Sequence, residues 1–313
     1  MKKIHLLIIL ILFSCTGSAQ DTFSSEELLI MNDSIQLLGT LSYNSELKSQ
    51  PLAIFIHGSG NVDRNGNQTM MNANANYIKM LNDSLVSRGI AFFRFDKRTA
   101  TPSNIKFIMS NMSFEGFVED INLIINTFKD DNRFSSITLI GHSQGSLIGM
   151  LANHIHVDKY ISLAGPSKSI DHILVEQVRL QNGNEIADKM ESHFKELAEQ
   201  GSIDNVDPML LSLFNKPTQP FMLSWMAYTP SEEIKRVELP ILIINGNKDL
   251  QVSVTEAETL HQANLKSKLI IIDNMNHVLK TIEKDEDNMA SYMSPDFPLS
   301  KQLVDEITTF IKQ

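Results

Sequence analysis

Cysteine is almost absent from this sequence, with Cys15 as the only example among 313 residues. Cys15 also lies in an N-terminal segment that we expect to be removed or lipidated. We therefore expect no disulfide bond, no cysteine nucleophile and no zinc-thiolate site in the mature protein. The hydrophobic share of 42% is large enough for a sizeable core, which excludes a disordered or collagen-like chain.

Basic residues are also fewer than acidic residues, with 27 lysines and arginines against 37 aspartates and glutamates. The formal net charge of −10 repels phosphate backbones and anionic lipid headgroups. We therefore expect no nucleic-acid partner. Net charge bears on solubility and encounter rather than on catalysis, so any active site has to be argued from individual residues.

The N-terminal apolar run, Leu6–Phe13, is too short to span a bilayer. With Lys2 and Lys3 before it and the small residues Gly17-Ser18-Ala19 after it, the run is typical of a signal peptide covering residues 1–19. Leu12-Phe13-Ser14-Cys15 offers the alternative of a lipoprotein signal that ends before Cys15, and a lipid there would be the only membrane attachment. Both routes predict an exported protein, either periplasmic or secreted.

Past residue 20, short apolar runs alternate with longer helical patterns. This alternation is typical of βαβ units and predicts an α/β fold, in which a mostly parallel, twisted sheet carries helices on both faces. The expected strands are Gln36–Tyr43, Leu52–His57, Ile90–Phe95, Ile137–Ile140, Lys159–Ala164, Ile241–Asn245 and Leu269–Ile272. The expected helices are Asn76–Ser87, Phe114–Phe128, Gly145–His154, Thr255–Ala263 and Lys301–Ile311.

The alternation breaks over residues 167–236, where no strong strand pattern occurs. Amphipathic segments at Ile170–Leu180 and Asn184–Glu199 are followed by a part that is punctuated by prolines. We interpret this stretch as a helical cap inserted between two parts of the core, residues 20–166 and residues 237–313. The alternative interpretation is a longer crossover between two core strands.

The strongest chemical signal is a G-x-S-x-G pattern from Gly141 to Gly145, with Ser143 at its centre. The pattern follows the apolar run Ile137–Ile140 and precedes an apolar helical pattern. Strand, sharp turn and helix form the setting of a nucleophile elbow, in which the serine hydroxyl is exposed. The glycines let the turn pack closely against neighbouring backbone. Ser143 is therefore the candidate nucleophile.

A serine hydroxyl is a weak nucleophile, so it needs a base and a third group that orients the base. Asp249 and His277 each follow an expected strand, and open α/β sheets keep their sites beyond the C-terminal ends of strands. The chain order of serine, acid and histidine also fits a nucleophile elbow. We therefore expect Asp249 as the acid and His277 as the base. Asp273 is the alternative acid, but its place on the loop of His277 favours a role in the turn.

Other histidines give weaker candidates. His154-x-His156 has the spacing of a metal-binding pair, but no carboxylate or thiolate accompanies it in the sequence. We therefore interpret both histidines as surface residues and expect no metal site.

An oxyanion hole completes this kind of site, because the charge on a tetrahedral intermediate needs preset hydrogen-bond donors. The backbone N–H of Gln144, directly after the nucleophile, is the first expected donor. The second should come from the loop after an early strand, where His57-Gly58-Ser59-Gly60 lets backbone amides approach a ligand. We expect the N–H of Ser59 there, with Gly60 as the alternative.

Five motifs occur in one order along the chain: His57-Gly58-Ser59-Gly60 with Asp63-Arg64, Arg94-Phe95-Asp96-Lys97-Arg98, Gly141-His142-Ser143-Gln144-Gly145, Asn245-Gly246 with Asp249 and Gln251-Val252, and Asn276-His277. Over about residues 35–312 the chain resembles the α/β-hydrolase superfamily. More narrowly, it is similar to the bacterial HGSG-type serine esterases near dienelactone-hydrolase-like and serine-aminopeptidase-like proteins.

This resemblance implies an α/β-hydrolase fold and a serine esterase that cleaves small, often short-chain, carboxylic esters without a metal or an organic cofactor. Carried over by position, it implies Ser143 as nucleophile, Asp249 as acid and His277 as base, with backbone donors at Ser59 and Gln144.

One segment departs from the pattern of these relatives, which usually carry a glycine-rich turn after the Asp-Lys-Arg segment. This chain has Arg98-Thr99-Ala100-Thr101-Pro102-Ser103 instead, which leaves the substrate fit open. We expect Asp96 and Arg98 to form structural ion pairs, and Asp63-Arg64 to brace the oxyanion loop.

Two other functions remain alternatives. The same three residues could cleave amides, as in an amidase or a peptidase, or the chain could be an exported binding protein on a hydrolase scaffold without turnover. Near the end of the cap, Met222, Trp225, Met226 and Tyr228 either line a pocket or pack in a core.

Overall fold

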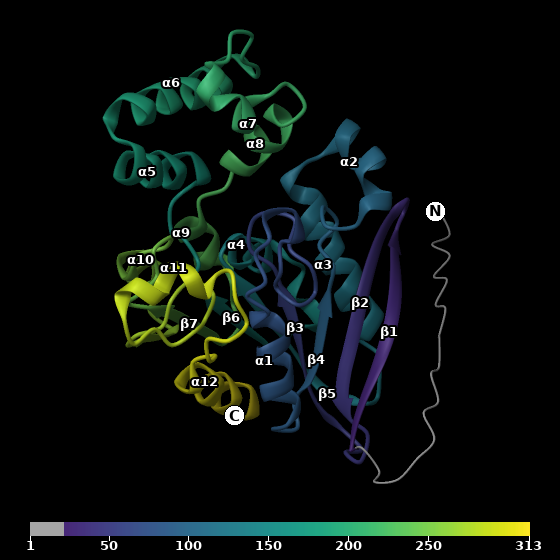
Figure 1. Cartoon of the computed structure of the whole chain (residues 1–313). Coiled ribbons are helices and arrows are strands. Elements are labelled where there is room, and N and C mark those ends of the chain that lie inside the picture. The colour runs from purple at the N-terminus through teal and green to yellow at the C-terminus, as the bar shows by residue number, and fades with distance from the viewer. Residues whose placement is uncertain (1–21) are drawn as a thin grey trace.

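The computed structural model describes residues 22–313, except for the side chains of Ser110 and Asn111. Its centre is one eight-stranded sheet with the strand order β1-β2-β4-β3-β5-β6-β7-β8 (Figure 1). The strands are β1 (Phe23–Asn32), β2 (Ile35–Asn44), β3 (Gln50–Ile56), β4 (Ala91–Phe95), β5 (Phe134–His142), β6 (Lys159–Leu163), β7 (Ile241–Gly246) and β8 (Lys268–Ile272).

The sheet is parallel except at one side, where β2 runs antiparallel to both β1 and β4. From β4 to β8 every neighbouring pair is parallel, so the C-terminal ends of these strands meet at one edge of the sheet. That edge is where open α/β sheets place their ligands. The mostly parallel sheet predicted from the sequence is therefore confirmed, and each of the seven expected strands is present.

Strand β1 is the one that the sequence analysis missed. It lies at the open side of the sheet, and its burial alternates between exposed and half-buried positions over its first half. Two serines and two glutamates stand in that half, so the apolar run that predicts a buried strand is absent. The strand forms because it pairs with β2 along its whole length, from Phe23 opposite Asn44 to Asn32 opposite Ile35.

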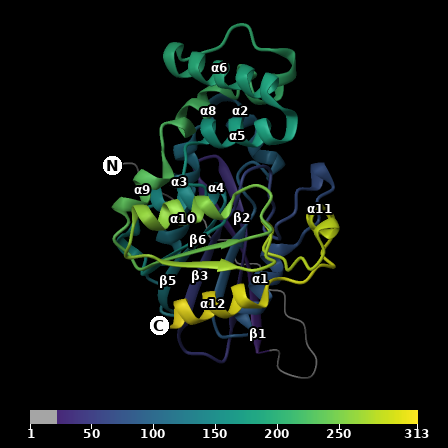
Figure 2. The ribbon, with the colours of Figure 1, turned by 90° about the vertical axis from the view of Figure 1, so that its left-hand side faces the viewer.

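Helices cover both faces of the sheet (Figures 1 and 2). On one face, α1 (Tyr77–Val86) and α12 (Lys301–Lys312) bury their apolar sides against β3 to β8. On the other face lie α3 (Phe114–Phe128), α4 (Gln144–Leu151) and α10 (Val254–Ala263). The remaining helices of the core are the short α2 (Ile105–Asn111) and α11 (Asn288–Ser291).

Between β6 and β7 the described chain forms helices and no strand. These are α5 (Ile170–Asn182), α6 (Asn184–Gln200), α7 (Leu211–Phe214), α8 (Gln219–Met226) and α9 (Pro230–Glu233). We call residues 167–236 the helical segment. Its helices α5 to α8 lie together at one end of the molecule, above α3 and α4 in Figure 1.

The helical segment is joined to the core by an aromatic contact. The Trp225 ring stacks on Phe114 of α3 at 5.4 Å between ring centres, and Phe221 packs edge-on against Phe117 at 5.9 Å. Met222 is also buried in this contact, so the aromatic and methionine residues of α8 serve mainly as packing.

Two sequence predictions fall on residues that the structure does not describe, namely the signal peptide and Cys15. Within residues 22–313, the helices are too short or too polar to cross a membrane.

Candidate active site

Ser143 occupies a strained turn between β5 and α4. Its backbone has φ 53° and ψ −119°, a conformation that residues with a side chain adopt rarely. The flanking glycines explain how the turn fits: a Cβ on Gly141 would overlap the backbone of Gly145, and one on Gly145 would overlap the carbonyl of Ile56 in β3. The turn therefore has the geometry of a nucleophile elbow, and the strain projects the serine side chain from the backbone.

Asp249 and His277 form a hydrogen-bonded pair. His277 Nδ1 lies 2.8 Å from Asp249 Oδ2, and the Asp249 side chain is completely buried. The other carboxylate oxygen accepts hydrogen bonds from the backbone N–H groups of Gln251 and Val252 at 2.8 and 2.9 Å. These bonds fix the carboxylate so that it can hold the imidazole in one orientation.

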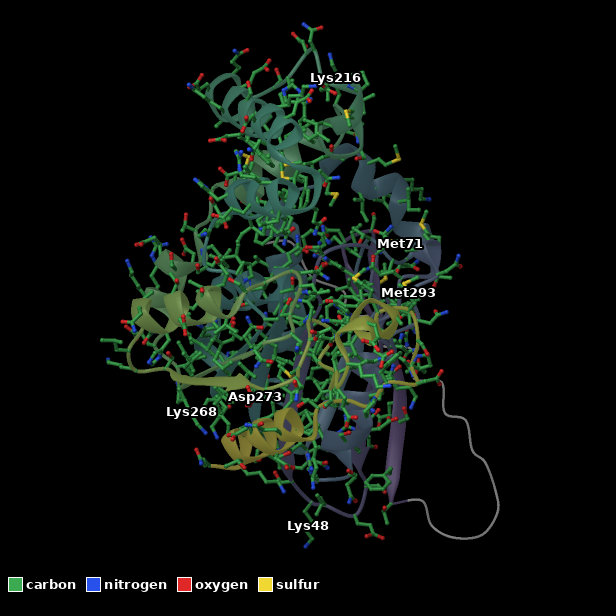
Figure 3. All side chains as sticks on the ribbon, turned by 60° about the vertical axis from the view of Figure 1, so that its left-hand side comes forward. Lys48, Met71, Lys216, Lys268, Asp273 and Met293 are labelled. Carbon is green, nitrogen blue, oxygen red and sulfur yellow. The ribbon has the colours of Figure 1, made fainter. Side chains whose placement is uncertain are left out.

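The two loops that carry this pair are tied to each other. The N–H of Lys248 donates to the carbonyl of Met275 at 3.0 Å, and the N–H of Asn247 donates to Ile272 at 3.2 Å. Gly246 is needed at this point because a Cβ there would overlap the Met275 carbonyl. Asp273, the alternative acid, is exposed and accepts a hydrogen bond from Asn247 at 2.8 Å instead (Figure 3).

Ser143 and His277 line the same cavity, which has a volume of about 110 Å³. Its other lining residues come from the loop after β3, from the start of α1 and from the loops before α10 and around α11. They are Gly58, Ser59, Val62, Gly66, Gln68, Ala73, Ala75, Tyr77, His142, Gln251, Val278 and Tyr292. Three of the predicted site residues, Ser59, Ser143 and His277, therefore line one cavity at the C-terminal edge of the sheet, and His277 contacts a fourth, Asp249.

His142, the second residue of the elbow, holds the loop of His277. Its Nε2 lies 2.8 Å from the His277 carbonyl oxygen, so Nε2 carries the proton and donates it. Its Nδ1 is then an acceptor, and the Tyr77 hydroxyl lies 3.4 Å away. Burial lowers the pKa of His142 well below its usual range, and the neighbouring His277 adds to this effect. His142 is therefore a neutral side chain that links the elbow to the loop of His277.

Of the two expected oxyanion donors, Ser59 lines this cavity and Gln144 directly follows the lining residue Ser143. Ser59 lines it, and the preceding Gly58 is so close to the elbow that a Cβ there would stand 3.2 Å from the Ser143 Cβ. Gln144 begins α4, where backbone N–H groups have no acceptor within the helix. Among the described residues, the N–H groups of Ser59 and Gln144 have no protein acceptor.

Lys97 lies directly beneath these donors and is buried. Its Nζ donates to the carbonyl of Gly58 at 2.6 Å and to Gln144 Oε1 at 2.5 Å. Burial lowers the pKa of Lys97 to about 7. Burial, together with the charge of Lys97, lowers the pKa of the nearby His57 to about 3, so His57 is neutral.

The charged residues of the Asp-Lys-Arg segment pair with different partners. Arg64 binds Asp96 through two side-chain hydrogen bonds, of 2.7 and 3.1 Å, and so ties the loop after β3 to the end of β4. Arg98 binds Asp120 of α3 at 2.6 and 2.7 Å, with both side chains buried. The predicted structural role of Asp96 and Arg98 is confirmed, although they do not pair with each other.

The segment that departs from the glycine-rich turn is held by side chains rather than by glycines. Thr99 donates to the carbonyl of Gly60 at 3.2 Å, which links the segment to the loop of Ser59. Asn104 is fully buried and donates to the carbonyls of Gln36 and Arg98 at 2.9 and 3.1 Å. These contacts restrain the segment through side-chain hydrogen bonds.

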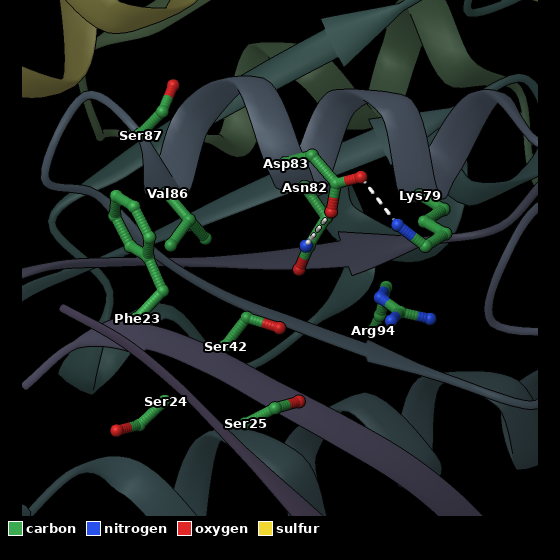
Figure 4. A pocket seen from close by; sticks show the side chains of 10 residues that line it. All are labelled: Phe23, Ser24, Ser25, Ser42, Lys79, Asn82, Asp83, Val86, Ser87 and Arg94. Carbon is green, nitrogen blue, oxygen red and sulfur yellow. Dashed lines mark hydrogen bonds and ion pairs between the residues drawn. The ribbon is translucent and has the colours of Figure 1, made fainter. Parts of the chain in front are cut away.

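A larger hollow of about 390 Å³ lies between β1, β2 and α1, but it lacks the groups for acyl transfer (Figure 4). Serines, Lys79, Asp83 and Arg94 line it, and none of its described lining residues is a histidine. Residues 22–313 also contain no group of three histidines, cysteines or acids that could hold a metal ion. His154 Nε2 instead donates to the carbonyl of Gly149, 2.8 Å away.

Sequence reasoning missed Tyr77, Lys97 and Tyr292 as residues of this site. Tyr77 and Tyr292 come from α1 and from the end of α11, and neither belongs to a motif. Lys97 stood inside a quoted motif, but its partners are 39 and 47 positions away along the chain. Only the packing of neighbouring strands reveals these contacts.

Methionines stand exposed beside the mouth of the cavity. Met70 and Met71 lie in the turn between the lining residues Gln68 and Ala73, and Met289 and Met293 flank Tyr292. Their exposed fractions are 87, 68, 66 and 47%. Figure 3 shows Met71 and Met293 on the same side of the molecule, so apolar and flexible side chains are exposed near the residues that line the cavity.

Comparison with known proteins agrees with this geometry. Residues 71–212, which include Ser143 but not Asp249 or His277, match the serine aminopeptidase family S33. Esterase EstD of Thermotoga maritima is 23% identical over 269 residues, which are 83% of this chain. The chain spans 62% of the length of that relative.

Solved structures share the fold at low sequence identity. The Pyrococcus furiosus esterase Pf2001 superposes with a TM-score of 0.60 at 16% identity, over 95% of each chain. Est1E from Butyrivibrio proteoclasticus gives 0.56 at 17% identity, over 91% of this chain and 98% of its own. A dienelactone hydrolase from Anabaena variabilis gives 0.54 at 12% identity, over 93% and 98%. The strand order, the strained elbow and these likenesses together show that the chain has the α/β-hydrolase fold.

Proposed function

We propose that this protein is an exported serine hydrolase that cleaves carboxylic esters through an acyl-enzyme. The observation that carries the proposal is the strained Ser143 in one cavity with His277, whose Nδ1 binds the buried Asp249. Relatives named as esterases support the class of reaction. The export signal is a proposal from the sequence alone.

In the proposed first step, His277 takes the proton of the Ser143 hydroxyl while the oxygen attacks the ester carbonyl. The backbone N–H groups of Ser59 and Gln144 bind the resulting oxyanion. His277 then gives its proton to the leaving alcohol, and a carboxylic ester now joins the acyl group to Ser143. Water, deprotonated by His277, attacks this ester in the same way and releases the acid.

The size of the cavity supports a short acyl group. Ligand pockets for drug-sized molecules have volumes of roughly 300–1,000 Å³. The cavity beside Ser143 measures about 110 Å³, which suits an acetyl-sized group far better than a long chain. We propose that the helical segment, residues 167–236, acts as the cap that limits access for the rest of the substrate.

A peptidase is the second candidate, because residues 71–212 match a serine aminopeptidase family. An aminopeptidase must bind the positively charged amino terminus of its substrate, for which a carboxylate is the natural partner. None of the described residues that line the cavity is an aspartate or a glutamate. This lining favours a neutral ester over a peptide with a free amino terminus.

Hydrolysis of p-nitrophenyl acetate by the mature chain tests the proposal. We expect Ser143→Ala to lower kcat on the order of 10³-fold or more while the circular dichroism spectrum stays unchanged. Ser25→Ala, which changes an exposed serine at the 390 Å³ hollow, should keep full activity and serves as the matched control.

Two further measurements separate the alternatives. Wild-type protein, but not the Ser143→Ala variant, should be labelled by a fluorophosphonate, and an unlabelled wild type would favour a binding protein without turnover. Faster cleavage of alanine p-nitroanilide than of p-nitrophenyl acetate would instead favour the aminopeptidase.

A further inference from the structure

Three loops meet beneath the proposed oxyanion hole, each at the end of a parallel strand. Lys97 follows β4, Gly58 follows β3 and Gln144 follows β5 after the elbow. Because the sheet order is β4-β3-β5, these loops are neighbours along one edge. The Nζ of Lys97 reaches both of the others, at 2.6 Å from the Gly58 carbonyl and 2.5 Å from Gln144 Oε1. One amino group thus connects all three loops.

The bond to Gly58 acts on the first oxyanion donor. The carbonyl of Gly58 and the N–H of Ser59 belong to the same peptide unit, which is planar and trans, so they point in opposite directions. A donor that holds the oxygen therefore aims the N–H away from Lys97. Ser59 lines the cavity with Ser143, and its N–H has no protein acceptor. The bond also polarises the peptide, which strengthens the N–H as a donor.

The bond to Gln144 acts on the second donor. Gln144 supplies its backbone N–H to the proposed hole, and its side chain is buried on the side of Lys97. The side-chain oxygen is held by Nζ at the first residue of α4, where the backbone direction is set. Lys97 thereby fixes the spacing between the peptide of Ser59 and the start of the helix.

The surroundings of Lys97 do not explain it as an ordinary structural lysine. Its side chain is 4% exposed, and the ring of Phe117 lies 4.8 Å from Nζ. Within residues 22–313 it has no carboxylate partner, and Asp120, which lines the same small space, is already bound by Arg98. A buried amino group without a counter-ion is costly, so an apolar side chain would serve packing better.

We propose that Lys97 is a positioning residue for the oxyanion hole, which holds the Ser59 and Gln144 donors in place through the two hydrogen bonds of its amino group. Lys97 does not touch the substrate; it acts through the two backbone N–H groups. This inference rests on the proposed function, because an oxyanion hole has a task only if Ser143 attacks a carbonyl.

The test is Lys97→Met, which keeps an unbranched side chain of similar length and removes the donor. Loss of one complete oxyanion donor costs about 10²–10³-fold in kcat, and Lys97 acts only indirectly. We therefore expect kcat for p-nitrophenyl acetate to fall about 10–100-fold, with KM within about threefold of wild type. The Ki of a small trifluoromethyl ketone, which forms a charged tetrahedral adduct with the serine, should rise by the same factor as kcat/KM falls.

Two further variants keep the result interpretable. Lys159→Met removes a lysine that also donates to two backbone carbonyls, those of Phe310 and Ile311, and it should leave kcat and Ki unchanged. Gln144→Met removes one acceptor of Lys97 but keeps the backbone N–H. We expect it to lower kcat and to raise Ki in proportion, by a smaller factor, even if Lys97→Met fails to fold.

The outcomes separate this inference from the proposed function. A wild type that neither turns over ester nor reacts with a fluorophosphonate overturns both. An active wild type with a folded Lys97→Met variant of equal kcat overturns the role of Lys97 alone. A loss confined to KM, with an unchanged Ki for the trifluoromethyl ketone, also overturns it, because general distortion of the cavity would then explain the defect.

Discussion

Two regions of the molecule differ in how their charged groups are buried and paired. One is the edge of the sheet that carries Ser143, and the other is the helical segment of residues 167–236. At the edge, charged and polar groups are buried and individually bound, as in Arg98 with Asp120 or Asp249 with His277. In the helical segment, the Arg179 ion pair with Asp188 lies at the surface instead, with side chains that are 36 and 65% exposed. The structure at the edge depends on particular side chains, whereas the helical segment depends on the alternation of apolar and polar residues along its helices.

Glycines show the same difference. Gly145 is surrounded by backbone atoms of β3, so no side chain can be placed there without moving a strand. Gly183 and Gly201, at helix ends of the segment, have no atoms within 4 Å of a hypothetical Cβ. The comparison teaches that the elbow at the edge has no space for an added side chain, whereas these two helix ends of the segment do.

The largest contrast should appear when a histidine is removed from each region. We expect His277→Ala to reduce kcat for p-nitrophenyl acetate on the order of 10³-fold or more, because Ser143 loses its base. His172→Ala in α5, where the side chain is 69% exposed, should change kcat by less than about twofold. Equal losses in both variants would contradict the division between the two regions.

A second contrast concerns arginine ion pairs. Arg98→Met leaves Asp120 buried without a partner, so we expect the free energy of unfolding to fall by about 3–5 kcal/mol. Arg179→Met removes exposed pairs with Asp188 and Glu191, and a change below about 1 kcal/mol is expected. Urea unfolding followed by circular dichroism measures both values. A larger effect at Arg179 would show that its exposed ion pairs stabilise the helical segment more than their exposure predicts.

The smallest contrast in the free energy of unfolding involves the glycines. Gly145→Ala forces a Cβ against the carbonyls of Ile56 and His57, which should cost about 1–3 kcal/mol and displace the elbow enough to abolish most ester hydrolysis. Gly201→Ala meets no atoms, but its φ of 76° is unfavourable for alanine by about 1 kcal/mol. Activity per folded molecule should stay at the wild-type value only in the second variant.

The fold could be predicted from the sequence where a buried helix or strand shows a regular spacing of apolar residues. Helix α3 begins and ends at the expected residues, Phe114 and Phe128, because its apolar face is regular and Ser113 caps its first turn. Strand β1 and the short helices α2 and α7 were missed, since they are stabilised by neighbours rather than by their own periodicity. The α/β-hydrolase fold followed from the order of motifs.

The candidate site could also be predicted only in part. Ser143, Asp249 and His277 could be chosen because each stands at a recognisable turn beyond a strand. In the structure Ser143 and His277 line one cavity, and His277 contacts Asp249. Lys97 and Tyr77 could not be chosen, because their contacts join segments that are distant along the chain. The sequence also named Asp96 and Arg98 as ion-pair residues without revealing that Arg64 and Asp120 are their partners.

Four exposed methionines lie near the lining residues of the cavity along the chain, and they make this surface sensitive to the redox state of its surroundings. Oxidation to the sulfoxide turns each apolar thioether into a polar, chiral group without any change in the fold. At 47 to 87% exposure, Met70, Met71, Met289 and Met293 would react before the buried methionines of the core. Peroxide should therefore convert these four side chains to polar groups close to the residues that line the cavity of Ser143.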